Sequence, residues 1–153
     1  MIALWRRRHR APRADSATGR SARTVAWPLP RDDTAAGRAR DLTRTTLATW
    51  QLAEDLVGDC LLATSELVTN ALRHAHGPIT LRLACDDALL RCEVTDGSPV
   101  EPYLATPNED EPRGRGLLVL TALAHDWGTH PHPDGGKTVW FTLTSASAAA
   151  VPA

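Results

Sequence analysis

The sequence predicts an α+β fold, a two-layer α/β sandwich in which helices cover one face of a mixed, mostly antiparallel sheet. Two helical patterns come first and two hairpin-forming strands follow them, an order that is typical of α+β domains. Apolar and polar residues alternate along the expected strands 79–84 and 89–95, as they do in a sheet that has one solvated face. A chain of 153 residues suits one compact domain.

The composition is that of an ordinary soluble domain, with 42% hydrophobic and 23% charged residues. No apolar run is long enough to cross a bilayer, and the N-terminal charges follow the apolar residues, the reverse of a secretory signal. We therefore expect a cytoplasmic protein with no membrane partner. The cysteines, Cys60, Cys85 and Cys92, lack a C-x-x-C spacing, which predicts reduced, packed thiols.

Charge is distributed unevenly along the chain. Residues 1–23 hold seven Arg and one Asp, a charge of +6, which leaves −7 for the remainder because the net charge is −1. We predict a basic, disordered tail over 1–22, a single domain over 23–145 and a flexible C-terminus over 146–153. A basic tail can contact nucleic acid or acidic lipid. A solvated extension is the commoner case, and we expect no direct binding of nucleic acid.

The first half of the domain predicts one strand and two helices. The strand over 24–27 should end at Pro28, because proline lacks the amide that a strand interior needs. The first helix has an apolar side that runs from Ala35 to Trp50, and the second covers residues 56–76 with an irregular turn at Gly58. Gly77 and Pro78 should stop the second helix.

The second half predicts strands around one short helix. Strands over 79–84 and 89–95 should form a hairpin, and a long loop over 99–113 follows them. The segment 114–116 opens a helix over 117–124. A strand starting at 126–129, a turn over 130–136 and a strand over 137–144 complete the domain.

The second predicted helix carries two polar groups on an otherwise apolar element. Glu66 and Asn70 are four residues apart and therefore project side by side. The amide oxygen of Asn70 suits Mg²⁺, which prefers oxygen ligands and keeps waters beside substrate phosphates. Glu66 could orient or deprotonate a nucleophile near that metal. The simpler interpretation is that Glu66 is paired with an arginine, since unpaired charges are costly to bury.

Two further motifs could converge on the same site. Asp96, at a strand end, can accept a hydrogen bond from an exocyclic amine, which would select adenine over guanine. Gly114 and Gly116 would let backbone amides approach phosphate oxygens at a helix N-terminus. Each motif is weak alone, because Asp-Gly is ordinarily a turn. The order and spacing of all three motifs together make the prediction specific.

Other nucleotide and metal sites fit less well. The chain has no G-x-x-x-x-G-K-[ST] motif, which excludes a P-loop. The histidine pairs at 74 and 76 and at 130 and 132 have no third ligand nearby, so they predict no metal site.

Four motifs stand in a characteristic order along the chain: Ser65–Ala75, Asp96–Pro99, Gly114–Leu117 and Gly136–Trp140. Together they resemble the GHKL ATP-binding domains, and among these the short, free-standing anti-sigma-factor serine/threonine kinases of bacteria. The resemblance covers roughly Thr24 to Leu143.

The resemblance implies ATP bound with Mg²⁺ under a lid formed by residues 99–113. Asn70 would hold the metal, Asp96 the adenine amino group, and Glu66 would act as general base toward a protein serine or threonine. Gly114 and Gly116 would face the phosphates and Thr138 would support the adenine end. The other nucleotide-binding residues that it implies are Arg73, Gly97, Arg115 and Leu117.

The resemblance also implies partners. It predicts a kinase that phosphorylates an anti-anti-sigma-like protein, with sequestration of a sigma factor and a homodimer as further expectations. The family's nucleotide box runs D-x-G-x-G, whereas this chain has Ser98 and Val100 where the glycines would stand. That difference favours the alternative, a nucleotide-binding regulatory module without kinase activity. A sensor histidine kinase is disfavoured because no helical hairpin with a phospho-accepting histidine is predicted.

Overall fold

The computed structural model describes residues 22–74, 76–98 and 115–144. Residues 1–21 of the predicted tail, the predicted lid and the predicted C-terminus therefore lie outside the described residues. The elements, in chain order, are β1 (Arg23–Leu29), α1 (Ala35–Thr49), α2 (Glu54–His74), β2 (Ile79–Cys85), β3 (Leu89–Asp96), α3 (Arg115–Leu123), β4 (Asp126–Pro131) and β5 (Lys137–Thr144).

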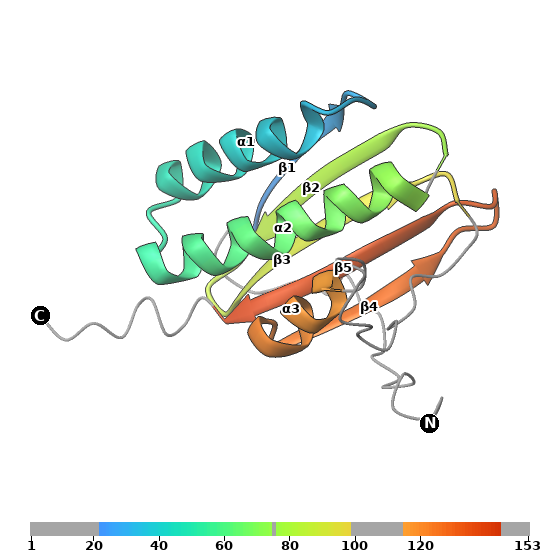
Figure 1. The fold of residues 1–153 in the computed structure, drawn as a ribbon. Helices are drawn as coiled ribbons and strands as arrows, with labels where there is room; N and C mark the ends of the chain where they lie inside the picture. Colours follow the sequence, from blue (N-terminus) through green and yellow to red (C-terminus); the bar gives the residue numbers. More distant parts are fainter. Residues whose placement is uncertain (1–21, 75, 99–114, 145–153) are drawn as a thin grey trace, which may run out of the picture.

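The strands form one five-stranded sheet in the order β1-β2-β3-β5-β4, and every pairing is antiparallel. Figure 1 shows α1, α2 and α3 in one layer against one face of this sheet. The α+β sandwich predicted from the sequence is confirmed. None of the helices in the described ranges is long and apolar enough to cross a membrane.

Strand alternation separates the two faces of the sheet. On the helix-covered face of β3 and β5, the register pairs Cys92 with Phe141 and Val94 with Val139, and all four side chains are buried. The next pair with the same orientation is Asp96 and Lys137. The core thus runs along both strands and ends at one charged pair.

Two cysteine thiols pack around the hydroxyl of Thr64 on α2. Its Oγ1 lies 3.3 Å from the Sγ of Cys92 on β3 and 3.8 Å from the Sγ of Cys60. Burial raises the pKa of Cys60 to about 12 and that of Cys92 well above the usual thiol value. Cys60, Cys85 and Cys92 are all buried thiols outside any disulfide, as the sequence predicted.

Some boundaries differ from the prediction. β1 continues through Pro28 to Leu29, because an edge strand tolerates a missing amide donor on its open side. α2 begins earlier, at Glu54, and continues without interruption through Gly58. β4 includes His130, which the sequence placed in a turn.

Candidate functional site

The face of α2 that packs against the core is apolar and buried. Glu66 and Asn70 lie on the same helix and are partly exposed. Neither of these two side chains has a hydrogen bond or ion pair with any residue that the structure describes. The arginine partner that the simpler interpretation required is thus not found within the described ranges. Arg73, three residues after Asn70, is exposed.

The chain after α2 contacts the end of β3. The amide of Gly97 donates a hydrogen bond to the carbonyl oxygen of His76 at 2.8 Å. A Cβ at position 97 would lie 2.6 Å from that same oxygen, so a larger residue would force the two segments apart. Gly77 has a φ of 73°, which glycine adopts without strain. These glycines hold Asp96 near the C-terminal end of α2.

The start of β5 lies against the same strand end. A Cβ on Gly136 would lie 2.6 Å from the carbonyl oxygen of Asp96, which again requires glycine for close approach. The register then places Lys137 directly opposite Asp96.

Asp96 and Lys137 form an ion pair on the helix-covered face. The Nζ of Lys137 lies 2.9 Å from both carboxylate oxygens, and the side chains of Lys137 and Asp96 are 7% and 3% exposed. The amide of Ser98 donates a third hydrogen bond, 2.8 Å long, to Oδ1 of Asp96. Lys137 is not among the site residues predicted from the sequence. Because Lys137 lies two residues before Val139 on the same strand, alternation would have predicted that both side chains face the core.

Thr138 lies on the other face of the sheet. Its hydroxyl is 2.7 Å from the hydroxyl of Thr95 and 2.7 Å from Nε2 of His132. Successive strand residues point to opposite faces, so Thr138 lies apart from the pair formed by Asp96 and Lys137.

The predicted phosphate segment forms the beginning of α3. Arg115, Gly116 and Leu117 make its first turn, and Gly114 lies outside the described residues. α3 packs against α2, the helix that carries Glu66 and Asn70. In Figure 1, α3 lies beside α2 on the same face of the sheet.

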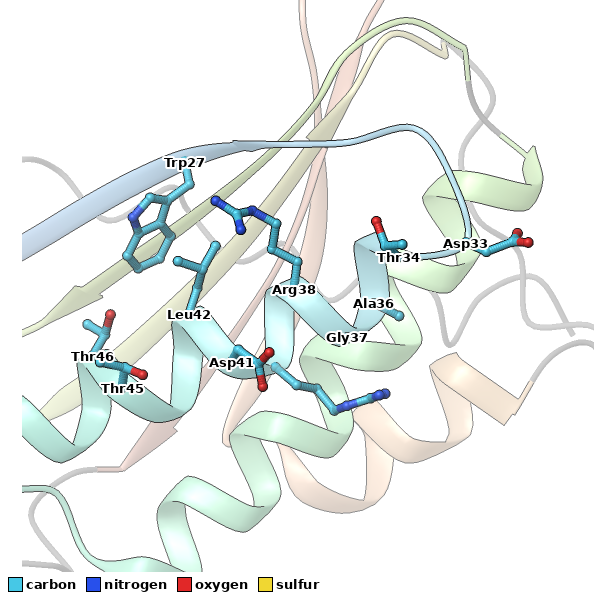
Figure 2. Close-up of a pocket in the computed structure, with 11 residues that line it drawn as sticks. Trp27, Asp33, Thr34, Ala36, Gly37, Arg38, Asp41, Leu42, Thr45 and Thr46 are labelled. Atoms are coloured by element: carbon cyan, nitrogen blue, oxygen red, sulfur yellow. The ribbon is translucent and has the colours of Figure 1, made fainter.

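A separate groove runs between β1 and α1 (Figure 2). Trp27 of β1 and Arg38 and Leu42 of α1 line it, and none of the predicted site residues does. The groove therefore does not belong to the candidate site. Within the described ranges no group of three or more His, Cys, Asp or Glu side chains could hold a metal ion.

Comparison with known proteins identifies the family. Residues 29–143 match the model of the histidine kinase-like ATPase domain. A crystal structure of the RsbU and RsbW domains of Rv1364c from Mycobacterium tuberculosis is similar, with a TM-score of 0.61 and 24% sequence identity. The match covers 78% of this chain and 32% of that one, and at this identity it establishes the fold alone. No curated protein matches. Because the family match spans most of the sequence, the chain belongs to the histidine kinase-like ATPase domain family.

Proposed function

We propose that this protein binds ATP with Mg²⁺ beside α2 and transfers the γ-phosphoryl group to a serine or threonine of a partner protein. The observation that carries the proposal is the pair of polar side chains on α2. Glu66 and Asn70 stand one turn apart on α2 without a partner within the described ranges, and the chain just after α2 contacts the end of β3 that holds Asp96. A carboxylate and an amide with no structural partner are available to a ligand.

Asp96 retains the capacity to bind an exocyclic amine. A carboxylate offers about four acceptor positions. Among the described residues, Oδ1 accepts from the amide of Ser98 and from Lys137, whereas Oδ2 accepts from Lys137 only. One position on Oδ2 therefore remains for the amino group of adenine.

Asn70 fits a magnesium ion that is held mainly by its substrate. Mg²⁺ usually takes one or two protein oxygens and completes its shell with waters and phosphate oxygens. When bound, the ion would neutralise charge on the phosphates. Arg73 is exposed one turn further along α2 and would approach the same phosphates. The amides at the start of α3, with Gly114 before them, would complete the phosphate site.

Glu66 would act as general base. Its carboxylate would take the proton of the serine or threonine hydroxyl while that oxygen bonds to the γ-phosphorus. The bond from the γ-phosphorus to its bridging oxygen would break, and ADP would leave with the bond's electron pair.

The proposed acceptor is an anti-anti-sigma-like protein, with a sigma factor as a second partner. The resemblance of the Ser65–Ala75 motif to anti-sigma-factor kinases supports this part of the proposal. The second candidate function is a nucleotide-binding regulatory module that lacks kinase activity. The observation that favours it is Lys137, which already occupies most of the carboxylate of Asp96.

Replacing Glu66 tests the chemistry. We expect Glu66→Gln to bind ATP as wild type does and to reduce phosphotransfer by about 100-fold or more, the usual contribution of a general base. The matched control is Glu54→Gln, the same change at an exposed position in the first turn of α2. The measurement is transfer of ³²P from labelled ATP to a panel of purified anti-anti-sigma-type proteins.

Two results would change the assignment. Equal transfer by Glu66→Gln and wild type would remove Glu66 from the mechanism. ATP binding by wild type with no labelling of any acceptor would favour the module without kinase activity.

A further inference from the structure

The single lysine of this chain is buried beside the proposed adenine site. The sequence has one Lys among its 17 basic residues, and it is Lys137. Lys137 is 6% exposed, whereas none of the arginines from Arg23 to Arg91 is buried. Burying an ion pair is costly because both ions lose their hydration, and a protein with hydrophobic residues of similar size in their place is often as stable. Fold stability alone therefore does not explain a lysine at this position.

Within the described ranges the ion pair leaves one acceptor position and one donor without a hydrogen-bond partner. The ammonium of Lys137 carries three N–H groups, and its two hydrogen bonds within the described ranges go to Oδ1 and Oδ2 of Asp96. Among the described residues Oδ2 accepts from Lys137 only, which leaves one acceptor position on it, while the amide of Ser98 donates to Oδ1. The third N–H and the open position on Oδ2 can therefore contact two neighbouring atoms of one ligand.

We propose that Lys137 and Asp96 together bind the Watson–Crick edge of adenine, so that Lys137 is a specificity-determining residue. Oδ2 of Asp96 accepts a hydrogen bond from the 6-amino group, and Nζ of Lys137 donates one to N1. This inference rests on the proposed function, since it assumes that adenine binds at Asp96. It adds a second, charged contact that distinguishes purines.

Asp96 and Lys137 would reject guanine if it entered the site in the orientation proposed for adenine. Guanine presents a carbonyl oxygen at position 6 and an N–H at position 1. The oxygen would meet the carboxylate of Asp96 and the N–H would meet the ammonium of Lys137. Two buried mismatches of this kind leave polar groups unpaired, which is the strongest basis for rejecting a similar ligand.

The test compares ATP with 1-deaza-ATP, in which a C–H group replaces N1. We expect wild type to bind 1-deaza-ATP at least about tenfold more weakly, as the loss of a hydrogen bond to a charged group predicts. Lys137→Met should bind ATP about tenfold more weakly than wild type and should no longer distinguish the two nucleotides. The control is Arg82→Met, the same kind of change on the open face, which is the face of the sheet that the helices do not cover. This variant should retain the wild-type preference for ATP over 1-deaza-ATP. Binding is measured by calorimetry.

Three results would overturn the proposal. If Lys137→Met binds ATP as tightly as wild type or more tightly, Lys137 blocks the site or does not contact the base. If that variant still prefers ATP to 1-deaza-ATP, another group binds N1. If wild type binds neither nucleotide, the proposed function itself fails, and the inference fails with it.

A measurement on wild type covers the case in which Lys137→Met does not fold. Because the chain has one lysine, selective ¹⁵N-lysine labelling yields a single side-chain ammonium signal in NMR spectra. Saturation with ATP should shift this signal, and ribose 5-triphosphate, which lacks the base, should leave it unchanged. A signal that ATP does not move would contradict the contact between Lys137 and adenine.

Discussion

The two faces of the sheet carry similar charged groups in different surroundings. On the helix-covered face, Lys137 and Asp96 pair at 2.9 Å with side chains that are 7% and 3% exposed. On the open face, Glu93 lies between two arginines, 2.6 Å from Nε of Arg91 and 3.3 Å from Arg82, and these side chains are 19% to 42% exposed. Arg91 also lies over the ring of Trp140, 4.2 Å from the ring centroid.

The difference in burial gives the two groups different roles. Charges on the open face remain partly hydrated, so each pair there contributes about 0–1 kcal/mol to stability. The buried pair contributes little net stability, yet removing one partner leaves an uncompensated charge. Interactions on the open face can therefore be purely structural. The buried pair lies at the end of β3 that contacts the chain after α2, where we propose that adenine binds.

The largest expected effect comes from breaking the buried pair. Asp96→Leu alone should lower the free energy of unfolding by about 3–5 kcal/mol, because it leaves the ammonium of Lys137 buried and unpaired. The double variant Asp96→Leu/Lys137→Met should recover most of that loss, since it replaces both charges with apolar groups. Urea denaturation of wild type, both single variants and the double variant measures the coupling. If the double variant lost as much free energy of unfolding as the two single variants together, the two charges would not depend on each other.

A much smaller effect is expected on the open face. Arg91→Lys retains the charge but weakens the contacts with Glu93 and Trp140, so we expect a loss of about 0.5–1 kcal/mol. Arg44→Lys is the control, because Arg44 is exposed and its pairing with Asp41 is 3.4 Å long. Urea denaturation is again the measurement. A loss for Arg91→Lys as large as that for Asp96→Leu would remove the contrast between the two faces.

Local patterns in the sequence predicted most elements of the fold. The apolar periodicity of α2, the alternation of β2 and β3 and the turn at Asp86 and Asp87 all correspond to observed elements. The ends of elements were less predictable. The extension of β1 through Pro28 depends on the edge position of that strand, which a local pattern does not contain. The early start of α2 has a local signal that the prediction missed, because Glu54 and Asp55 are acidic residues in its first turn.

The candidate site was predictable only in part. Glu66 and Asn70 were recognised by their spacing on one helix, which the structure retains. The pairing of Asp96 with Lys137 joins residues 41 positions apart, and strand register over that distance cannot be read from local sequence. The face on which Thr138 lies could have been predicted from strand alternation. Val139 and Phe141 face the core side of β5, so Thr138, which is next to Val139, faces the other side.

The most direct test of the account is titration of the full chain with ATP by calorimetry, with and without Mg²⁺. We predict magnesium-dependent binding by wild type and by Thr69→Ala, a control at the neighbouring position on α2, and at least tenfold weaker binding by Asn70→Ala. ATP binding that neither the removal of Mg²⁺ nor Asn70→Ala changes would show that the nucleotide does not bind beside α2.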